Sequence, residues 1–285
     1  MQEFDRMHPV GPIFTVELFP ELSAQLLGML RSFSTLEWQL STACPGWSVQ
    51  DVVAHLLGGS LGRLTSAYRQ ASESKVVQKP NNFHELLDFI NRQNAEWVDA
   101  ARRISPPLLI DFLELTGPKL YQYFKSLPPF SPASISVAWA GDDQSPVWFD
   151  IAREYTEKWL HQQHIREAAG RPLLIERKWL HPVLDTFMRA LPYTYEEIAV
   201  PDGTAIWFSI TGEAGGDWSL LRQTNRWELY SGQPDHPAAS VFFGQDSAWR
   251  LFTRGTSPEV AQSKMRFEGD HQLGSKIVQM VSIMA

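Results

Sequence analysis

The chain has 285 residues, 44% hydrophobic and 20% charged, which is the composition of an ordinary globular protein. Its net charge is −7, and no basic run is longer than a pair such as Arg102-Arg103, so an extended nucleic-acid-binding surface is not expected. Cys44 is the only cysteine, which excludes an internal disulfide and a cysteine-based zinc cluster.

The sequence shows no targeting segment. The N-terminal stretch MQEFDRMHPVGPIF carries charges where a signal peptide needs an apolar core. No stretch approaches about 20 uninterrupted apolar residues, the length of a membrane span. We therefore expect a cytoplasmic protein without a membrane partner.

The first part of the chain predicts long amphipathic helices, because apolar residues recur there at helical spacing. They are expected over residues 16–33, 48–71, 81–103, 106–127 and 145–170. Ser48 and Asp51 resemble a capping box at the start of the second helix. Gly117-Pro118 predicts a break or kink in the fourth. Together these segments indicate an antiparallel bundle of four or five helices.

The helix over 145–170 has marked ends. Ser145 is a suitable N-cap, and Pro146 needs no N–H in the first turn. Gly170 can take the left-handed conformation that closes a helix. The segment 128–145 before it is rich in Pro, Ser, Gly and Asp, and a connection of this length could cover a site.

After Pro172 the pattern changes to short elements. Residues 204–211 alternate apolar and polar side chains, as a half-buried strand does. Further strands are expected over 218–223 and 226–231 as a hairpin, over 239–243 and within 264–270, with helices over 246–252 and 271–284. The expected fold class is α + (α+β), with a helical bundle over 1–172 and a small α+β domain over 173–285.

Glu157 and His161 are four residues apart in the helix over 145–170, and His164 follows one turn later. This spacing places a carboxylate and an imidazole on one helix face, where both can bind the same divalent metal. The competing interpretation is a solvated polar face, since Arg153 and Glu154 share this stripe. A third ligand from another helix would decide for the metal.

His55 lies on the polar side of the helix over 48–71, among Gly58, Gly59 and Gly62. Each glycine inside a helix costs about 1 kcal/mol relative to alanine. Either close packing or space for a ligand beside His55 would offset that cost. His55 itself is a hydrogen-bonded helix histidine or a metal ligand.

Three stretches carry a resemblance to known families. CPGWSVQDVVAHLLGG and EKWLHQQHIR resemble the two signatures of the mycothiol-dependent maleylpyruvate isomerase N-terminal-domain family, a DinB/YfiT-like metal-binding helical bundle. The C-terminal half, with PAASVFFGQDSAWRLFTRG, resembles the sterol-carrier-protein-like domain often found behind this bundle.

The resemblance implies a divalent metal, zinc first and nickel as the alternative, bound by His55, Glu157 and His161. The family usually has Asp in place of His164, which leaves that residue three roles: fourth ligand, partner of a ligand, or solvated side chain. Arg153 and Arg254 are candidates for contacting an anionic substrate, as is Arg266. No catalytic residue beyond the metal ligands is expected.

The implied chemistry uses a low-molecular-weight thiol, mycothiol or an analogue, as cosubstrate. A thiol bound to the open position of the metal loses its proton. In the resembled isomerase the thiol adds to the double bond of maleylpyruvate, which leaves a single bond. Rotation about that single bond and elimination of the thiol then give the trans isomer. The expected activity is therefore a thiol-dependent isomerase or S-transferase acting on a small electrophile.

Three further expectations remain. The alternative function is a non-catalytic small-molecule or lipid carrier with a vestigial or sensing metal site. The expected assembly is a monomer or a homodimer. Cys44 lies in the turn TACPGW with no predicted base beside it, so it is expected to be structural.

Overall fold

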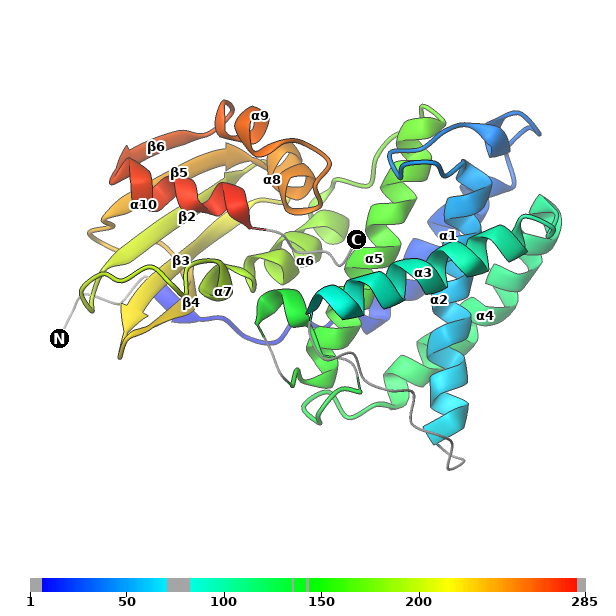
Figure 1. Cartoon of the computed structure of the whole chain (residues 1–285), viewed down its shortest axis with the longest axis horizontal. Coiled ribbons are helices and arrows are strands. Elements are labelled where there is room, and N and C mark those ends of the chain that lie inside the picture. Colours follow the sequence, from blue (N-terminus) through cyan, green and yellow to red (C-terminus); the bar gives the residue numbers. More distant parts are fainter. Residues whose placement is uncertain (1–6, 71–82, 135, 142–143, 281–285) are drawn as a thin grey trace. The chain divides into compact units, whose positions relative to one another are not determined.

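The computed structural model describes residues 7–70, 83–134, 136–141 and 144–280 (Figure 1). These residues form two compact units. The helical unit takes its residues from Phe14–Ser131 and Glu154–Leu174, and the sheet unit from Met1–Ile13, Pro132–Arg153 and Ile175–Met284. The division of the chain into domains 1–172 and 173–285 stays a prediction.

The helical unit contains the helices expected from the apolar periodicity, each within its predicted range, and a 3₁₀ turn over 37–39 that was not predicted. They are the 3₁₀ turns η1 (Val16–Leu18) and η2 (Glu37–Gln39), helices α1 (Phe19–Leu30), α2 (Val49–Gln70), α3 (Phe83–Ala101) and α4 (Pro106–Ser126), and α5 (Val147–Ala168) from Glu154 onward. Helix α2 packs against α3 and α4, and α1 packs against α4.

The start of α2 is fixed by the predicted capping box. The backbone N–H of Ser48 donates to Oδ2 of Asp51 at 3.0 Å, and the N–H of Asp51 lies 3.3 Å from Oγ of Ser48. The two residues thereby satisfy each other's backbone donors at the helix N-terminus. The capping box is confirmed.

Helix α4 runs through Gly117 and Pro118, so the predicted break is wrong, and the alternative of a kink stays a prediction. A proline inside a helix removes one backbone hydrogen bond. Here the helix buries one apolar face on both sides of Pro118, including Leu113 and Leu120. Packing of that face against α1 and α2 outweighs the local cost.

Helix α5 ends as expected but begins two residues later than the predicted N-cap. Its first residue is Val147, and the Ser145 hydroxyl accepts the N–H of Val137 at 2.8 Å. At the other end Gly170 has a φ of +61°, and the N–H of Arg171 donates to the carbonyl of Arg166 at 2.7 Å. A left-handed glycine therefore closes the helix.

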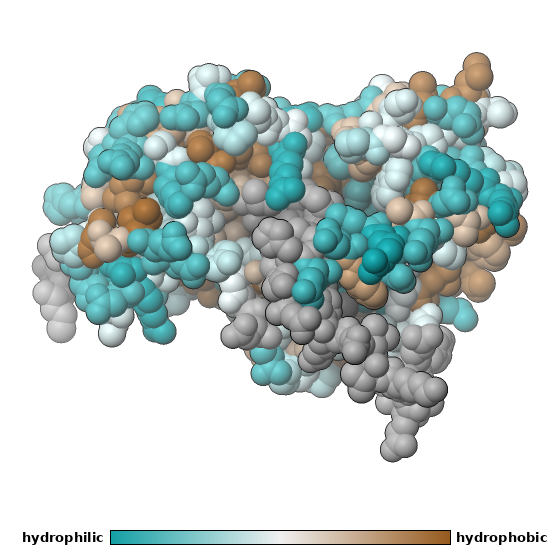
Figure 2. Space-filling model, in the orientation of Figure 1, coloured by the Kyte–Doolittle hydropathy of each residue, from teal (hydrophilic) through white to brown (hydrophobic). Residues whose placement is uncertain are grey.

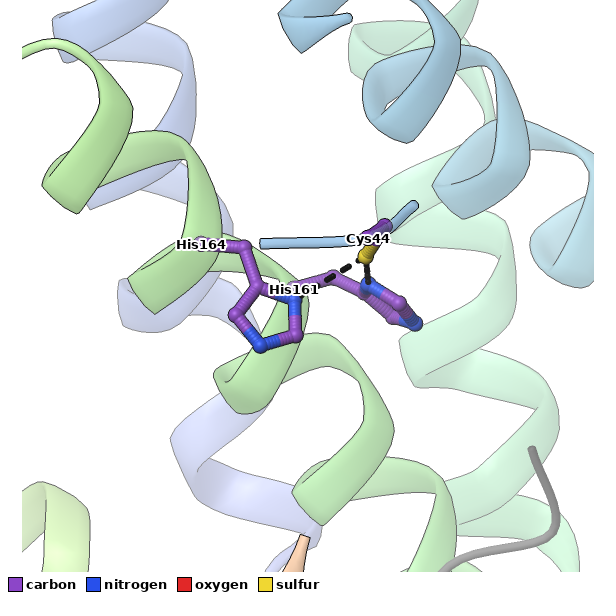
Figure 3. A group of neighbouring side chains, drawn as sticks. All are labelled: Cys44, His161 and His164. Carbon is purple, nitrogen blue, oxygen red and sulfur yellow. Dashed lines mark hydrogen bonds between the residues drawn. The ribbon is translucent and has the colours of Figure 1, made fainter. Parts of the chain in front are cut away.

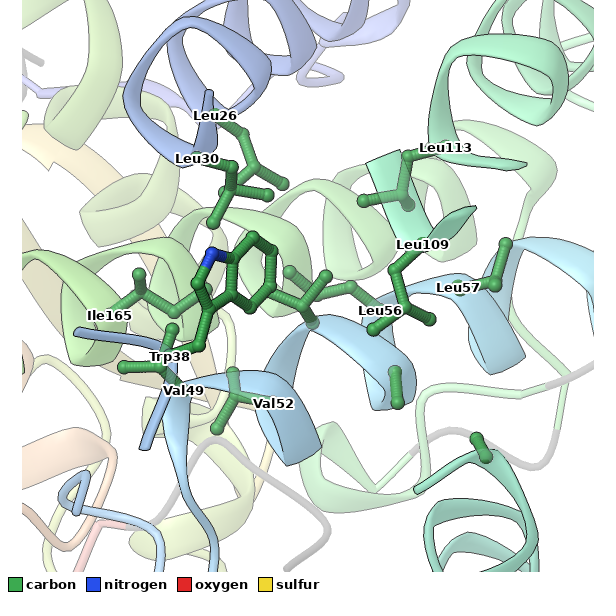
Figure 4. Packing of buried hydrophobic residues seen from close by; sticks show 13 residues of the cluster. Leu26, Leu30, Trp38, Val49, Val52, Leu56, Leu57, Leu109, Leu113 and Ile165 are labelled. Atoms are coloured by element: carbon green, nitrogen blue, oxygen red, sulfur yellow. The ribbon is translucent and has the colours of Figure 1, made fainter. Parts of the chain in front are cut away.

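The core of the helical unit surrounds Trp38, whose exposed fraction is 4% (Figure 4). Side chains from α1, α2, α4 and α5 meet in this cluster, which contains Leu26, Leu30, Trp38, Val49, Val52, Val53, Ala54, Leu56, Leu57, Ala101, Leu109, Leu113 and Ile165. Burial of apolar area stabilises such a core by about 25 cal/mol per Å². The buried face of α2 is thereby fixed, and with it the direction in which its polar side points.

One of the three helix glycines has a packing reason. A Cβ on Gly58 would lie 2.5 Å from the indole ring of Trp97. That indole donates from Nε1 to the carbonyl of Ala54 at 2.7 Å, which holds α3 close to α2. A Cβ on Gly59 or Gly62 would meet nothing within 4 Å, so close packing accounts for Gly58 alone.

The sheet unit is built on a six-stranded mixed sheet in the order β1-β4-β3-β2-β5-β6. The strands are β1 (Met7–Pro9), β2 (Ala205–Thr211), β3 (Gly216–Gln223), β4 (Arg226–Gly232), β5 (Ala239–Gly244) and β6 (Arg266–Gly269). Strands β2 and β5 are parallel, with Ile206 opposite Ala239, and the other pairs are antiparallel. The predicted hairpin turns at Thr224 and Asn225, which both have positive φ.

Short helices accompany the sheet: α6 (Arg177–Met188), α7 (Leu191–Thr194), α8 (Gln245–Phe252), α9 (Pro258–Gln262) and α10 (His271–Ser275), with 3₁₀ turns η3 (Ala138–Ala140) and η4 (Lys276–Gln279). Helices α8 and α10 contact β5, and α7 contacts β4. The predicted helix over 271–284 is wrong in length, since α10 ends at Ser275 and residues 281–284 lie outside the described part. Gly274 in this helix has a packing reason, since a Cβ there would lie 3.2 Å from Phe267 and Val241.

The exposed face of α3 is polar. Figure 2 shows hydrophilic side chains gathered along α3 on the face drawn, and exposed residues such as Arg92, Glu96 and Asp99 belong to it. Within the described ranges no helix has both the length and the apolar character to cross a membrane.

Candidate metal centre

His55 on α2 and the pair Glu157 and His161 on α5 meet inside the helical unit. Oε1 of Glu157 lies 3.1 Å from Nε2 of His55 and 3.1 Å from Nε2 of His161. The two imidazole rings are 4.6 Å apart, edge to face. The structure thus brings together the three residues that sequence reasoning singled out.

This arrangement fits a divalent metal. One donor atom from each of the three side chains lies within 4.8 Å of the others. Tetrahedral zinc, with bonds of about 2.0–2.2 Å to nitrogen and oxygen, separates its ligand atoms by about 3.3 Å. The observed 3.1 Å contacts need only a small adjustment to meet that spacing.

The charges of the three side chains depend on one another. Burial raises the pKa of Glu157, but the charge and hydrogen bonds of His161 and His55 outweigh it and hold that pKa well below its usual range. Burial lowers the pKa of His55. Burial acts the same way on His161, but Glu157 and Cys44 outweigh it and raise its pKa to about 10. The two histidines therefore favour the ionised form of the Glu157 carboxyl group.

The polar stripe of α5 is largely buried, not a solvated face. Nε of Arg63 donates to Oε2 of Glu154 at 3.1 Å, with side-chain exposures of 11% and 7%. Nζ of Lys158 donates to the Ser60 hydroxyl at 2.9 Å. These contacts join α5 to α2 beside the candidate metal ligands. They fix the register in which His55 faces its partners.

Trp47 forms one wall of the site. Its ring lies 5.2 Å from the ring of His55. The side chain of His55 is 11% exposed, that of His161 12% and that of Glu157 37%. Glu157 therefore has the most exposed side chain of the three.

Cys44 and His164 form an extension of the site. Sγ of Cys44 lies 3.2 Å from Nδ1 of His164 and 3.6 Å from Nδ1 of His161 (Figure 3). Burial raises the pKa of Cys44, but the hydrogen bonds from both histidines outweigh it and lower that pKa to about 6. The expectation that no base lies beside Cys44 is wrong. The Cys-Pro-Gly-Trp turn before α2 was the available signal, because it leads directly into the helix that carries His55.

The predicted arginine contacts belong to the sheet unit. Arg153 donates to Oδ1 of Asp150 at 3.1 Å. Arg254 has a φ of +58°, and the guanidinium of Arg266 lies 3.7 Å from the ring centre of Phe242. A role for any of them towards a substrate stays a prediction.

A helical unit with this histidine and carboxylate set, joined to a mixed-sheet unit, places the chain among helical proteins with an added α+β part. A family model described as the mycothiol maleylpyruvate isomerase N-terminal domain matches residues 19–166, more than half of the chain. The chain therefore belongs to this family, which takes its name from an enzyme. Membership agrees with an enzymatic function.

A solved structure shares the fold of this chain. The crystal structure of a mycothiol-dependent maleylpyruvate isomerase in which one histidine is replaced by alanine matches with a TM-score of 0.50, at 12% identity over 83% of this chain and 86% of that chain. The structure of the isomerase without that replacement matches with a TM-score of 0.49, at the same identity and coverage. A UbiJ-SCP2 ubiquinone synthesis protein gives 0.24, at 16% identity over 34% of this chain and 81% of that chain. No curated protein matches.

Proposed function

We propose that this protein is a divalent-metal-dependent isomerase or S-transferase that uses a low-molecular-weight thiol, mycothiol first among them. One observation carries the proposal: a single carboxylate oxygen of Glu157 lies within 3.1 Å of ring nitrogens from His55 and His161. Family membership supports the thiol and the class of reaction.

The donor set favours zinc, with nickel as the alternative, because imidazole and carboxylate ligands suit both ions. When bound, the metal would supply a site at which a thiol is held as its thiolate. Three protein ligands leave a coordination position open, which is the pattern of catalytic and not of structural zinc.

The chain's own residues would hold this site in shape. The Nδ1 side of His161 faces Cys44, so a proton shared between them keeps Nε2 of His161 directed at Glu157. Trp47 packs against the ring of His55 and limits its rotation. The substrate would be a small electrophile with an activated double bond, and Arg153 or Arg254 would contact its anionic group.

Other parts of the proposal concern the rest of the chain. The sheet unit is assigned as a sterol-carrier-protein-like domain, and the domain limits as 1–172 and 173–285. The mixed sheet with short helices supports an α+β assignment of this unit. A cytoplasmic protein acting as a monomer or homodimer completes the assignment.

The test combines metal content with thiol-dependent turnover. Protein purified without an affinity tag is analysed for metals, then assayed with maleylpyruvate and other activated alkenes in the presence of mycothiol, bacillithiol or glutathione. We expect one zinc per chain and turnover with one of these thiols. Glu157→Gln should abolish turnover and weaken zinc binding by the His55–Glu157–His161 set, and Glu167→Gln on the same helix should change neither.

Two outcomes would contradict the proposal. If no metal binds after reconstitution with zinc, the site and the mechanism both fail. If zinc binds but no thiol supports turnover while the protein retains lipids, the carrier function replaces the enzymatic one.

A further inference from the structure

The two histidines that face Cys44 do so through the same ring atom. His161 and His164 are three residues apart on one face of α5, and both direct Nδ1 towards the sulfur (Figure 3). Sγ and the two Nδ1 atoms all lie within 4.8 Å of one another. Each of the three residues is only half-buried, so an ion could reach them.

We propose that Cys44, His161 and His164 form a second metal-binding position, selective for thiophilic divalent ions such as Zn²⁺, Cd²⁺ or Co²⁺. This inference goes beyond the proposed function, which uses the opposite nitrogen of His161. Tetrahedral zinc, with bonds of about 2.3 Å to sulfur and about 2.0–2.1 Å to nitrogen, separates these donors by about 3.5 Å. The observed separations of 3.6 and 3.2 Å bracket that value.

The donor types set the preference of this position. It offers one thiolate and two imidazoles, with no carboxylate among them, whereas the first set includes Glu157. Soft sulfur donors favour zinc, cadmium and cobalt over magnesium or calcium. The two positions should therefore differ in their response to a thiophilic ion.

His161 couples the two positions, because it presents Nε2 to Glu157 and Nδ1 to Cys44. With an ion on one nitrogen, a second ion on the other requires loss of the remaining ring proton. Filling both positions together is therefore less favourable than filling either one alone. The second ion should bind at least about 10-fold more weakly than the first, as expected when a partner of a metal ligand changes.

The experiment titrates reduced, metal-free, full-length protein with Co²⁺ and records the sulfur-to-cobalt charge-transfer absorption together with the number of ions bound by native mass spectrometry. The wild type should bind two ions and show the absorption. Cys44→Ser should bind one ion and show no charge-transfer absorption. His55→Gln should bind one ion and keep the charge-transfer absorption. His164→Gln should show that absorption only at a Co²⁺ concentration about 10-fold higher or more.

His181→Gln is the matched control, because this histidine lies in the sheet unit and Nδ1 contacts the carbonyl of Ala214 at 2.9 Å. It should behave as the wild type. The inference is overturned if saturated wild-type protein shows no thiolate absorption, a measurement that needs no variant to fold. It is also overturned if His55→Gln abolishes the absorption, since Cys44 would then belong to a single mixed site.

The same data separate this inference from the proposed function. If Cys44→Ser binds no cobalt, the His55–Glu157–His161 position fails while the thiolate position stands. If the wild type and Cys44→Ser both bind one ion without charge-transfer absorption, the first position stands and the second fails. Cadmium-113 NMR of the wild type gives an independent reading of sulfur ligation.

Discussion

Oε1 of Glu157 and Nε2 of His55 lie 3.1 Å apart across two helices, although 102 residues separate them in the chain. The contact follows from the register of α2 and α5. Arg63, further along α2, meets Glu154, which lies earlier on α5, so the two helices run antiparallel here. The proposed metal binding therefore depends on how these helices pack, and the first predictions concern that packing.

Replacing Arg63 by Met should lower the free energy of unfolding by about 3–5 kcal/mol, because it leaves the buried carboxylate of Glu154 without this partner. The double variant Arg63→Met/Glu154→Leu should recover part of that loss, because the unpaired carboxylate is removed, while Lys158 loses its 3.9 Å contact with Glu154. Urea unfolding followed by circular dichroism measures both. Equal destabilisation of the single and double variants would mean that the unpaired carboxylate is not the source of the loss.

Leu109→Ala should destabilise the helical unit by about 2–5 kcal/mol, because Leu109 is fully buried in the core around Trp38. Leu115→Ala is the matched control on the same helix. Its side chain is 58% exposed, and the change should be within about 0.5 kcal/mol. Similar losses for the two variants would contradict the core described here.

Asp51→Ala should lower stability at neutral pH by about 1–2 kcal/mol, because it removes both the capping box and the contact with Arg102. Asp99 also contacts Arg102, at 3.3 Å, but its side chain is 81% exposed. Asp99→Ala should therefore have an effect of less than about 1 kcal/mol. Urea unfolding at neutral pH distinguishes the two.

The effect of Asp51 should depend on pH. Burial raises the pKa of Asp51, but the hydrogen bonds from Arg102 and Ser48 outweigh it and lower that pKa below its ordinary value of 3.8. A carboxyl whose folded pKa is depressed stabilises the protein above its unfolded pKa, and this contribution is lost as the pH falls through the folded pKa. The gap in stability between wild type and Asp51→Ala should thus be full at pH 7 and shrink below about pH 4. A gap that stays constant down to pH 2 would show that ionisation of Asp51 is irrelevant.

Zinc should raise the melting temperature of the wild type in proportion to the logarithm of its free concentration, because an ion that binds only the native state stabilises it by mass action. His55→Gln should reduce this shift, since one ligand of the first set is missing. The melting temperatures of the two proteins should differ less when both are metal-free than when both hold zinc, because glutamine still offers a polar group beside Glu157. Differential scanning calorimetry with and without a chelator makes the comparison. An equal zinc shift in both proteins would remove His55 from the ligand set.

Local sequence signals were sufficient for much of the helical unit. The apolar periodicity located its helices, and the Ser48–Asp51 pattern located the start of α2, because both depend on residues only a few positions apart. Glu157 and His161 could be paired for the same reason. His55 could be added only through the family resemblance, because no local rule gives the packing of α2 on α5.

Other features lay beyond local rules. Helix α6 was not predicted, since Pro182 inside it argues against a helix, yet it buries a face that includes Trp179, Val183 and Phe187. Strand β1 has three residues, too few for a recognisable alternation. The histidines beside Cys44 approach it from more than a hundred positions away. Tertiary packing determines helix α6, strand β1 and the approach of the two histidines to Cys44.

The pairing of β1 with β4 has a consequence for how the chain folds. The Ser231 hydroxyl donates to the carbonyl of His8, 223 residues away. The helical unit can be complete once residue 174 has been synthesised, whereas the sheet must wait for strands that begin at Ala205. Contacts so distant along the chain form slowly. In pulse-labelled hydrogen exchange during refolding, amides of α2 and α4 should gain protection before those of β4, and the reverse order would place the start of folding in the sheet.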